Sequence, residues 1–550
     1  MIEWFVETFR GRKSDWRKAR KYLADAANSS FKEIMQGYDA FVPYMDEIPD
    51  PSILIGTAKD SLGNVVPVRI ATNEMHRNWL ITGGTGSGKT SFVTSVFTRA
   101  LEQGYGIGLV DCKEGFFDSA LRKVAAMAYR METAQRPQFI RSLAVINPFS
   151  DALVPLNVCK LLPGNTPEIQ AYDVCLSLSR LFNSDMGFQM QNVLLSLIHL
   201  LIEADLTLVE GPELMQDDLL RDILVNHATN PAVKDFFLRA YPSVPSNSKN
   251  ALLSRIQNLL LAENIRLMLG ADDLIDFKAI LDRGQPLFMF FGKGQGAPEE
   301  QVAVLASLVL QLLFQAAFST KSGKRRPYQI LLDEFFHLLD APALEKRFET
   351  ALTTLRSFGV MLSLVMHNFS QVSGTLRESI LNNCDYTAVF RTHSRNAQFF
   401  GDFLPELDPE FVKQTLKRTG RPPSKHEVKP YLMSRLQQLP DRHCYFYDKQ
   451  KPYRALLLRV PNVPKPESAL GISENALDEF MQEQGVLLGG YALPKHELRR
   501  QIETRQQRLK EITQLPPVHL HAVPESNSPT RINIEPGENP STKRKKPKIG

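Results

Sequence analysis

Apolar runs of four to eight residues recur along the chain and alternate with longer segments of helical periodicity. The runs occupy residues 52–59, 65–71, 79–82, 106–111, 142–147, 286–292, 329–335, 360–367, 386–392, 444–447 and 453–460. The first two flank a turn sequence and predict a hairpin. Strands that alternate with helices form right-handed crossovers within a mostly parallel sheet. We therefore predict an α/β fold whose ligands bind at the carboxyl ends of the strands.

A glycine-rich turn separates the strand at residues 79–82 from an apolar-periodic helix. Its residues are Gly83, Gly84, Thr85, Gly86, Ser87, Gly88, Lys89 and Thr90, followed by Ser91. Strand, turn and helix in this order are the context of a phosphate-binding P-loop, in which backbone N–H groups converge on a phosphate. We expect Lys89 to reach the β- and γ-phosphates and Thr90 to place its hydroxyl on Mg²⁺. A glycine-rich loop without chemistry would not explain this spacing, so the sequence predicts binding of ATP or GTP.

Acidic and polar residues end the later strands. Four apolar residues precede Asp333 and Glu334. We predict that Asp333 binds the magnesium shell and that Glu334 orients or deprotonates the attacking water, although such a pair can also be a surface feature. Asp111 is a supporting residue, a substrate-coupling residue or a helix cap. His367 either senses the γ-phosphate or is a structural hydrogen-bonding group.

The remaining segments define the predicted domains. Residues 161–284 have helical periods and no convincing strand, so we predict an all-α insertion within a nucleotide-binding domain formed by residues 51–160 and 285–462. Residues 1–50 predict an amphipathic helical segment, and residues 463–515 a helical extension with a charged helix near its end. Proline, serine, asparagine and lysine dominate residues 516–550, which predicts a disordered basic tail.

Charge, cysteine content and hydrophobicity indicate which partners and which cellular compartment to expect. The net charge of +5 is mild, but basic residues cluster near the start and in the tip from Lys543 to Lys548, which suits a polyanion or a solvated tail. The five cysteines are scattered without metal-ligand spacing, so we expect a reducing compartment and no structural zinc. We see no signal peptide, and the apolar runs at 193–202 and 302–318 are better explained as buried helices. We predict a cytoplasmic protein that reaches the inner membrane only through a partner.

Several motifs taken together resemble one family. They are the glycine-rich turn, Asp111-Cys112-Lys113, the helical insertion, Leu331 to Phe335, Asn368 to Val372, and Asn382 to Cys384 leading to Phe390-Arg391-Thr392. The set resembles the conjugative coupling proteins, the VirD4-, TraD- and TraG-like members of the FtsK–HerA superfamily of ring-forming DNA pumps. The resemblance implies a RecA-like motor that is hexameric when active and uses ATP and Mg²⁺. It implies DNA, a relaxase and the channel of a type IV secretion system as partners.

The chain departs from this family at two points. Family members usually have a glutamine at the position of His367, while Gln371 matches the second glutamine of the pattern. They also usually begin with transmembrane helices, which we do not find.

In a ring, the γ-phosphate needs a cation from the neighbouring subunit, and Arg391 is the first candidate for that finger, with Arg377 second.

Three hypotheses on function are open at this stage. The first is a DNA translocase serving conjugation. The second is a soluble HerA-like motor that processes DNA, or acts in defence, together with a nuclease. The third is a nucleotide-gated docking platform with little pumping activity.

Overall fold

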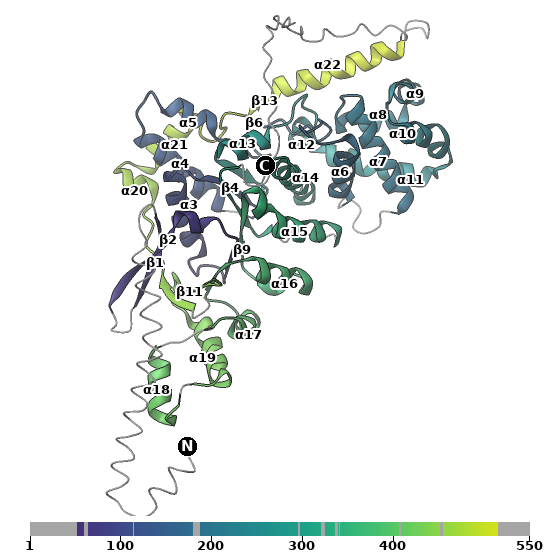
Figure 1. The fold of residues 1–550 in the computed structure, drawn as a ribbon. Helices are drawn as coiled ribbons and strands as arrows, with labels where there is room; N and C mark the ends of the chain where they lie inside the picture. The colour runs from purple at the N-terminus through teal and green to yellow at the C-terminus, as the bar shows by residue number, and fades with distance from the viewer. Residues whose placement is uncertain are drawn as a thin grey trace, which may run out of the picture.

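The computed structural model describes residues 52–514 except 60–63, 114, 180–186, 295–296, 321–324, 336–338, 340–341, 406–408, 422 and 451–454. The predicted segment 1–50 and the predicted tail 516–550 lie outside the described residues. An 11-stranded sheet with helices on both faces forms the centre of the molecule (Figure 1). Its strands are β1 (Ser52–Lys59), β2 (Val65–Ala71), β3 (Trp79–Thr82), β4 (Gly106–Asp111), β5 (Ala144–Ile146), β7 (Leu287–Phe290), β8 (Tyr328–Asp333), β9 (Val360–Met366), β10 (Tyr386–Phe390), β11 (His443–Asp448) and β12 (Ala455–Arg459).

The strand order is β2-β1-β12-β11-β10-β3-β9-β8-β4-β7-β5. The seven strands from β10 to β5 are parallel to one another, and the other four add as antiparallel neighbours. The predicted hairpin of β1 and β2 and the predicted mostly parallel α/β sheet are therefore confirmed. Because parallel strands end at one edge, the residues that follow β3, β4, β8, β9 and β10 lie along the same edge of the sheet.

Successive side chains of each strand point to opposite faces of the sheet, so each face has its own hydrophobic core. In β3, Trp79 and Ile81 pack with residues of one face, whereas Leu80 belongs to the core of the other face. The helices that accompany the sheet are α3 (Lys89–Glu102), α4 (Phe116–Arg130), α5 (Arg136–Ser142), α14 (Glu299–Phe318), α15 (Pro342–Thr354), α16 (Gly374–Asn383), α17 (Ser394–Phe403), α18 (Pro409–Thr419) and α19 (Lys425–Gln438). Fully buried strands of this kind have continuous apolar sequences, which is why the sequence predicts them well.

One helix of the described part, α14, is long and apolar enough to cross a membrane by length and composition. Its most apolar window is 78% buried inside the protein. It contacts α6 and α13 and lies within the larger hydrophobic core. The fold therefore uses α14 as a core helix, which agrees with the interpretation of its sequence.

Between β6 (Ala152–Leu153) and β7, the described residues form helices and turns that extend to one side of the sheet (Figure 1). The helices are α6 (Pro167–Leu178), α7 (Phe188–Glu203), α8 (Gly211–Gln216), α9 (Asp218–His227), α10 (Pro231–Asp235), the π-helix η4 (Phe236–Ala240), α11 (Ser246–Leu261), α12 (Glu263–Leu269) and α13 (Phe277–Arg283). Their apolar residues continue the core on one face of the sheet, so this helical region and the sheet share a hydrophobic core.

The segment after β12 joins both parts of the molecule. It contains α20 (Pro466–Leu470), α21 (Glu474–Glu483), β13 (Leu493–Pro494) and α22 (Lys495–Gln514). α21 packs on α4, Gly490 donates its N–H to the carbonyl of Leu143 beside edge strand β5 at 2.9 Å, and β13 pairs with β6. The sequence predicts a helical extension with a charged helix near its end, which corresponds to α22, but it does not predict the bounds of α20 and α21 or the strand β13.

Arg505 connects α22 to the helical region through a buried polar network. Its guanidinium forms an ion pair with Glu210 at 3.0 Å, donates to the Gly270 carbonyl at 2.7 Å and also pairs with Asp272. Glu210 is fully buried and accepts hydrogen bonds from the backbone N–H and the hydroxyl of Thr207 at 2.9 and 2.7 Å. A buried carboxylate depends on such partners, so Arg505 is the principal polar attachment of α22.

Arg505→Ala is expected to destabilise the protein by about 3–5 kcal/mol, because it leaves the buried carboxylate of Glu210 without its counter-ion. We expect a lower unfolding temperature in calorimetry and faster amide hydrogen exchange in α22. Arg508→Ala, at an exposed position of the same helix, is the matched control and should change stability by less than about 0.5 kcal/mol. Equal effects of the two substitutions would show that the network does not hold α22.

Candidate functional site

The glycine-rich turn lies between β3 and α3, at the edge where the parallel strands end. Three of its glycines have a positive φ, and at two of these, Gly83 with φ 154° and Gly88 with φ 105°, a side chain would also clash. A Cβ on Gly83 would lie 2.5 Å from Cβ of Phe390, and one on Gly88 would lie 2.7 Å from Cα of Arg442. Neighbouring segments therefore pack directly on the turn, and α3 begins at Lys89 with its N-terminal N–H groups facing the loop. Residues 83–90 form a P-loop.

Lys89 is 5% exposed and lies at the centre of the site. Its ammonium donates to the carbonyls of Gly83 at 2.5 Å and Gly84 at 3.0 Å and lies 2.8 Å from Nδ1 of His367. Burial lowers the pKa of Lys89 to about 8, against the opposing effect of the Glu334 and Asp333 carboxylates. A largely desolvated cation held by loop carbonyls is suited to binding an anion.

His367 connects the P-loop lysine to the carboxylate strand. One strand, β9, lies between β3 and β8, and His367 directly follows it. The backbone N–H of His367 donates to Oε1 of Glu334 at 2.7 Å, and the ring Nε2 lies 3.4 Å from the same oxygen. His367 therefore joins the P-loop lysine to the carboxylate of Glu334, which follows β8.

The neighbours of His367 also determine its protonation. A lysine ammonium can only donate, so Nδ1 accepts from Lys89 and Nε2 carries the ring proton toward Glu334. Burial, together with the Lys89 and Lys113 cations, lowers the pKa of His367 to about 4. The imidazole is therefore neutral at physiological pH and is fixed in one tautomer between a cation and a carboxylate.

Glu334 has an unusual backbone. Its φ of 52° lies in the left-handed region, which is costly for a residue other than glycine, and its N–H donates to the carbonyl of Val365 at 3.0 Å. The residue is 2% exposed, and burial raises the pKa of its carboxyl group. The chain after β8 thus turns sharply and places the carboxylate beside His367.

Asp333 ends β8, in register with Asp111 of β4. Burial and the nearby Asp111 and Glu334 carboxylates raise the pKa of Asp333 to about 8. Asp333 supplies carboxylate oxygens, and Thr90, which lies exposed in the first turn of α3, supplies a hydroxyl, and both are the oxygen ligands that Mg²⁺ prefers. The predicted ligands Thr90 and Asp333 therefore fit Mg²⁺ by their donor chemistry.

The structure supports the helix-cap alternative for Asp111. Its carboxylate is fully buried and accepts from the backbone N–H groups of Lys113 at 2.9 Å, Phe116 at 3.0 Å and Phe117 at 2.8 Å. The latter two are the first N–H groups of α4, so Asp111 caps that helix. Lys113 lies exposed beyond it, and its charge acts on Lys89, Asp333 and His367.

A second loop, residues 439–443, flanks the P-loop on the side away from β9. The N–H of Arg442 donates to the carbonyl of Ser87 at 2.8 Å, and Arg442 has a left-handed φ of 60°. The Arg391 carbonyl accepts a hydrogen bond from the N–H of Gly84 at 2.6 Å, and the guanidinium of Arg391 forms an ion pair with Asp441 at 2.8 Å. Arg391 thus lies against the P-loop of its own chain, and its role toward a neighbouring subunit stays a prediction.

Gln371 and Arg377 lie just beyond His367. Gln371 is exposed in the short helix η8 (Phe369–Gln371), and none of the described hydrogen bonds joins its side chain to Lys89 or Glu334. The guanidinium of Arg377 donates to the Val372 carbonyl at 2.9 Å and lies over the Phe369 ring. Arg377 therefore braces the segment after β9, while the catalytic part of Gln371 stays a prediction.

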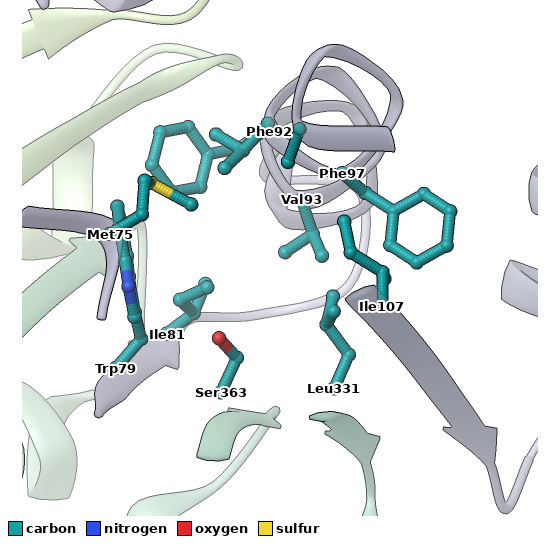
Figure 2. Close-up of a pocket in the computed structure, with 11 residues that line it drawn as sticks. Met75, Trp79, Ile81, Phe92, Val93, Phe97, Ile107, Leu331 and Ser363 are labelled. Carbon is teal, nitrogen blue, oxygen red and sulfur yellow. The ribbon is translucent and has the colours of Figure 1, made fainter. Parts of the chain in front are cut away.

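A small apolar cavity of about 20 Å³ lies between α3 and the sheet (Figure 2). Its walls include Trp79 and Ile81 of β3, Phe92 and Val93 of α3, and the Ser363 hydroxyl of β9. The cavity is far too small for a nucleotide and lies within the core between helix and sheet. This cavity therefore does not take part in nucleotide binding.

No family model and no curated protein sequence matches the chain. Solved structures with a similar arrangement include the unbound bacterial conjugative coupling protein TrwBdeltaN70, with 14% identity, a TM-score of 0.49, and coverage of 78% of this chain and 93% of that one. The plasmid coupling protein TrwB with ADP and Mg²⁺ has 15% identity, a TM-score of 0.49 and the same coverage. VirB4 of Thermoanaerobacter pseudethanolicus has 14% identity and a TM-score of 0.46, covering 76% of this chain and 98% of that one. At this level of likeness, they do not assign a function to the chain.

Substitution of His367 distinguishes a catalytic contribution from a structural one. If the neutral imidazole positions Glu334 and Lys89 during hydrolysis, His367→Ala should lower kcat by about 10–100-fold with little change in nucleotide affinity. His367→Gln, which also has a donor and an acceptor, should retain much of the rate. The measurement is kcat and KM for both variants together with their melting temperatures. A fall in melting temperature with an unchanged rate per folded molecule would make His367 structural.

Proposed function

We propose that the chain hydrolyses ATP with Mg²⁺ and uses the energy to move DNA or a relaxase–DNA complex toward a type IV secretion channel. The observation that carries the ATPase proposal is the chain of contacts from Lys89 through His367 to Glu334 at the end of the parallel strands. The proposal for DNA and its delivery rests on the set of motifs that resembles the conjugative coupling proteins.

Each residue of the site has a defined part in this proposal. The P-loop N–H groups and Lys89 bind the β- and γ-phosphates, because they present donors and a desolvated cation at one place. Glu334 orients or deprotonates water, and His367 holds that carboxylate in position. Thr90 and Asp333 would hold Mg²⁺, which neutralises phosphate charge when bound. Arg391 is proposed to stabilise the γ-phosphate of a neighbouring subunit in a hexamer.

The raised pKa of Glu334 supports a role in proton transfer. A carboxyl group whose pKa moves upward toward neutrality is a better base for water than an exposed one. Its left-handed backbone adds an independent indication, because strained residues persist where the surrounding structure holds them for a purpose. Membrane association in this proposal occurs through a partner.

The test combines nucleotide binding with turnover. Calorimetric titration with ATP, ADP and GTP in the presence of Mg²⁺ should give binding, and steady-state hydrolysis should rise when DNA is added. Binding without measurable turnover would favour a docking platform instead. Turnover that is insensitive to duplex and single-stranded DNA over a range of salt would contradict the DNA motor but not the ATPase.

A further inference from the structure

A helical arm between β10 and β11 concentrates positive charge. The basic arm, defined here as residues 409–438, consists of α18, a turn and α19 and projects from the sheet beyond β11 (Figure 1). Its acidic residues are Glu410 and Glu427, and its basic residues are Lys413, Lys417, Arg418, Arg421, Lys425, Lys429 and Arg435. Seven basic and two acidic residues give +5, which equals the formal charge of the whole 550-residue chain.

Packing inside the arm fixes which side faces solvent. Val412 and Leu416 of α18 and Leu432 of α19 are buried, and the rings of Phe411 and Tyr431 stack 4.0 Å apart. The stacked rings of Phe411 and Tyr431 join the two helices, while α19 also packs on α17.

Three of the arm's cations are exposed to solvent. Lys417 is exposed, the side chain of Arg418 is 72% exposed and that of Arg421 is 56% exposed. These three residues form a basic tip, which includes the end of α18 and the turn that follows it.

The acidic residues near the tip do not neutralise it. Glu427 pairs with Arg421 at 2.9 Å and with Arg418 at 3.7 Å, so one carboxylate serves two guanidinium groups. At the base, Lys429 pairs with Asp402 at 2.6 Å. Exposed pairs of this kind contribute little free energy and are readily exchanged for another anion. The tip therefore presents net positive charge to any polyanion.

The surroundings favour nucleic acid over a lipid surface. A peripheral membrane helix needs exposed apolar side chains to enter the interface. The large exposed hydrophobic residues of the described chain lie elsewhere, and none belongs to the basic arm. Arginine and lysine without an apolar face are typical of surfaces that contact a phosphate backbone irrespective of sequence.

The base of the arm is bonded to the P-loop. The N–H of Thr392 donates to the carbonyl of Leu436 in α19 at 3.0 Å, and Arg391 contacts both the Leu439 carbonyl and Asp441. The Arg391 carbonyl in turn accepts from Gly84. A continuous series of hydrogen bonds therefore joins the base of the arm to the phosphate-binding loop.

We propose that the basic arm binds the phosphate backbone of DNA and that its base couples this binding to the P-loop. The inference rests on the proposed function and adds the surface that takes the DNA. Because binding equilibria are reciprocal, DNA on the arm and nucleotide at the P-loop should each change the affinity of the other by the same factor.

The test removes the charge of the tip in the full chain. In the variant with Lys417, Arg418 and Arg421 all changed to Gln, DNA affinity in 0.1 M salt should fall at least about tenfold, and the slope of log affinity against log salt should decrease by about 3. ATP hydrolysis without DNA should match the wild type, whereas its stimulation by DNA should require a much higher DNA concentration. Fluorescence anisotropy with a labelled mixed-sequence duplex and steady-state hydrolysis provide the two measurements.

Two further variants control for charge and folding. The first changes Arg500, Arg508 and Lys510 to Gln, which removes the same charge from exposed positions of α22 and should leave DNA affinity within about twofold of the wild type. The second combines Lys417→Arg, Arg418→Lys and Arg421→Lys, and it should retain DNA binding.

Other results would overturn the inference. Equal losses in the tip and α22 variants would show that only overall charge matters. If the tip variant kept wild-type DNA affinity and DNA stimulation, the arm would not be the DNA-binding surface, although the proposed motor function would still stand. Loss of binding to phosphatidylserine vesicles, with unchanged DNA affinity, would make the arm a membrane surface. A wild-type protein that binds no DNA would contradict the proposed function itself.

Discussion

Glu334→Gln is expected to bind ATP with nearly wild-type affinity and to hydrolyse it about 10²–10⁴-fold more slowly. The amide has the same shape as the carboxylate and can still accept from the His367 N–H, so the local backbone has no reason to rearrange. It cannot accept a proton from water. The loss therefore falls on kcat and not on nucleotide binding.

Single-turnover hydrolysis and calorimetric ATP titration provide the two measurements for this substitution. Glu345→Gln changes a carboxylate on α15, outside the site, and should hydrolyse ATP at the wild-type rate. Comparable rates for wild type and Glu334→Gln would remove Glu334 from the mechanism and leave its strained backbone as a structural feature.

Lys89→Ala is expected to abolish nucleotide-dependent activity, with a fall in kcat/KM of about 10³-fold or more. Unlike Glu334, Lys89 interacts with the phosphates directly, so its loss should weaken both ATP binding and hydrolysis. The substitution also removes the ammonium that fills the space between the P-loop carbonyls and His367. The backbone N–H groups of the P-loop remain, but without the ammonium they lack the buried positive charge that balances the phosphates.

ATP titration and hydrolysis assays of Lys89→Ala should be accompanied by Lys234→Ala, which removes a lysine from α10 in the helical region. The control should behave as the wild type in both assays. Tight ATP binding by Lys89→Ala at an unchanged melting temperature would contradict the assignment of Lys89 to the phosphates.

The sequence predicts the strands of the parallel sheet well because both of their faces are buried. The runs at residues 106–111 and 360–367 coincide with β4 and β9 to within one residue. The segment after β12 is predicted poorly. Its short elements α20, α21 and β13 are stabilised by contacts with α4 and β6, far away in the sequence. The local hydrophobic pattern of a short segment does not predict contacts of this kind.

The candidate site shows the same division. Spacing in the sequence predicts Lys89, Asp333 and Glu334 as site residues, because each of them lies next to a predicted strand. It leaves His367 undecided, since the bond from its ring to Lys89 depends on β9 lying between β3 and β8. Arg442 was not predicted at all. Its contact with the P-loop arises from a left-handed turn that has no glycine to mark it.

The order of strands in the sheet has a consequence for synthesis of the chain. β3 pairs with β9 and β10, so Trp79 lies opposite Ser363 on one side and Tyr386 on the other. In β1, Thr57 is paired with Arg459, about 400 positions later in the sequence. Contacts so distant in sequence close slowly. On the ribosome, the helical region of residues 167–283 emerges complete while the P-loop strand still lacks both neighbours. A nascent chain released at residue 350 would contain the whole glycine-rich turn and yet bind no nucleotide, because the segments that shape the turn would not yet have been translated.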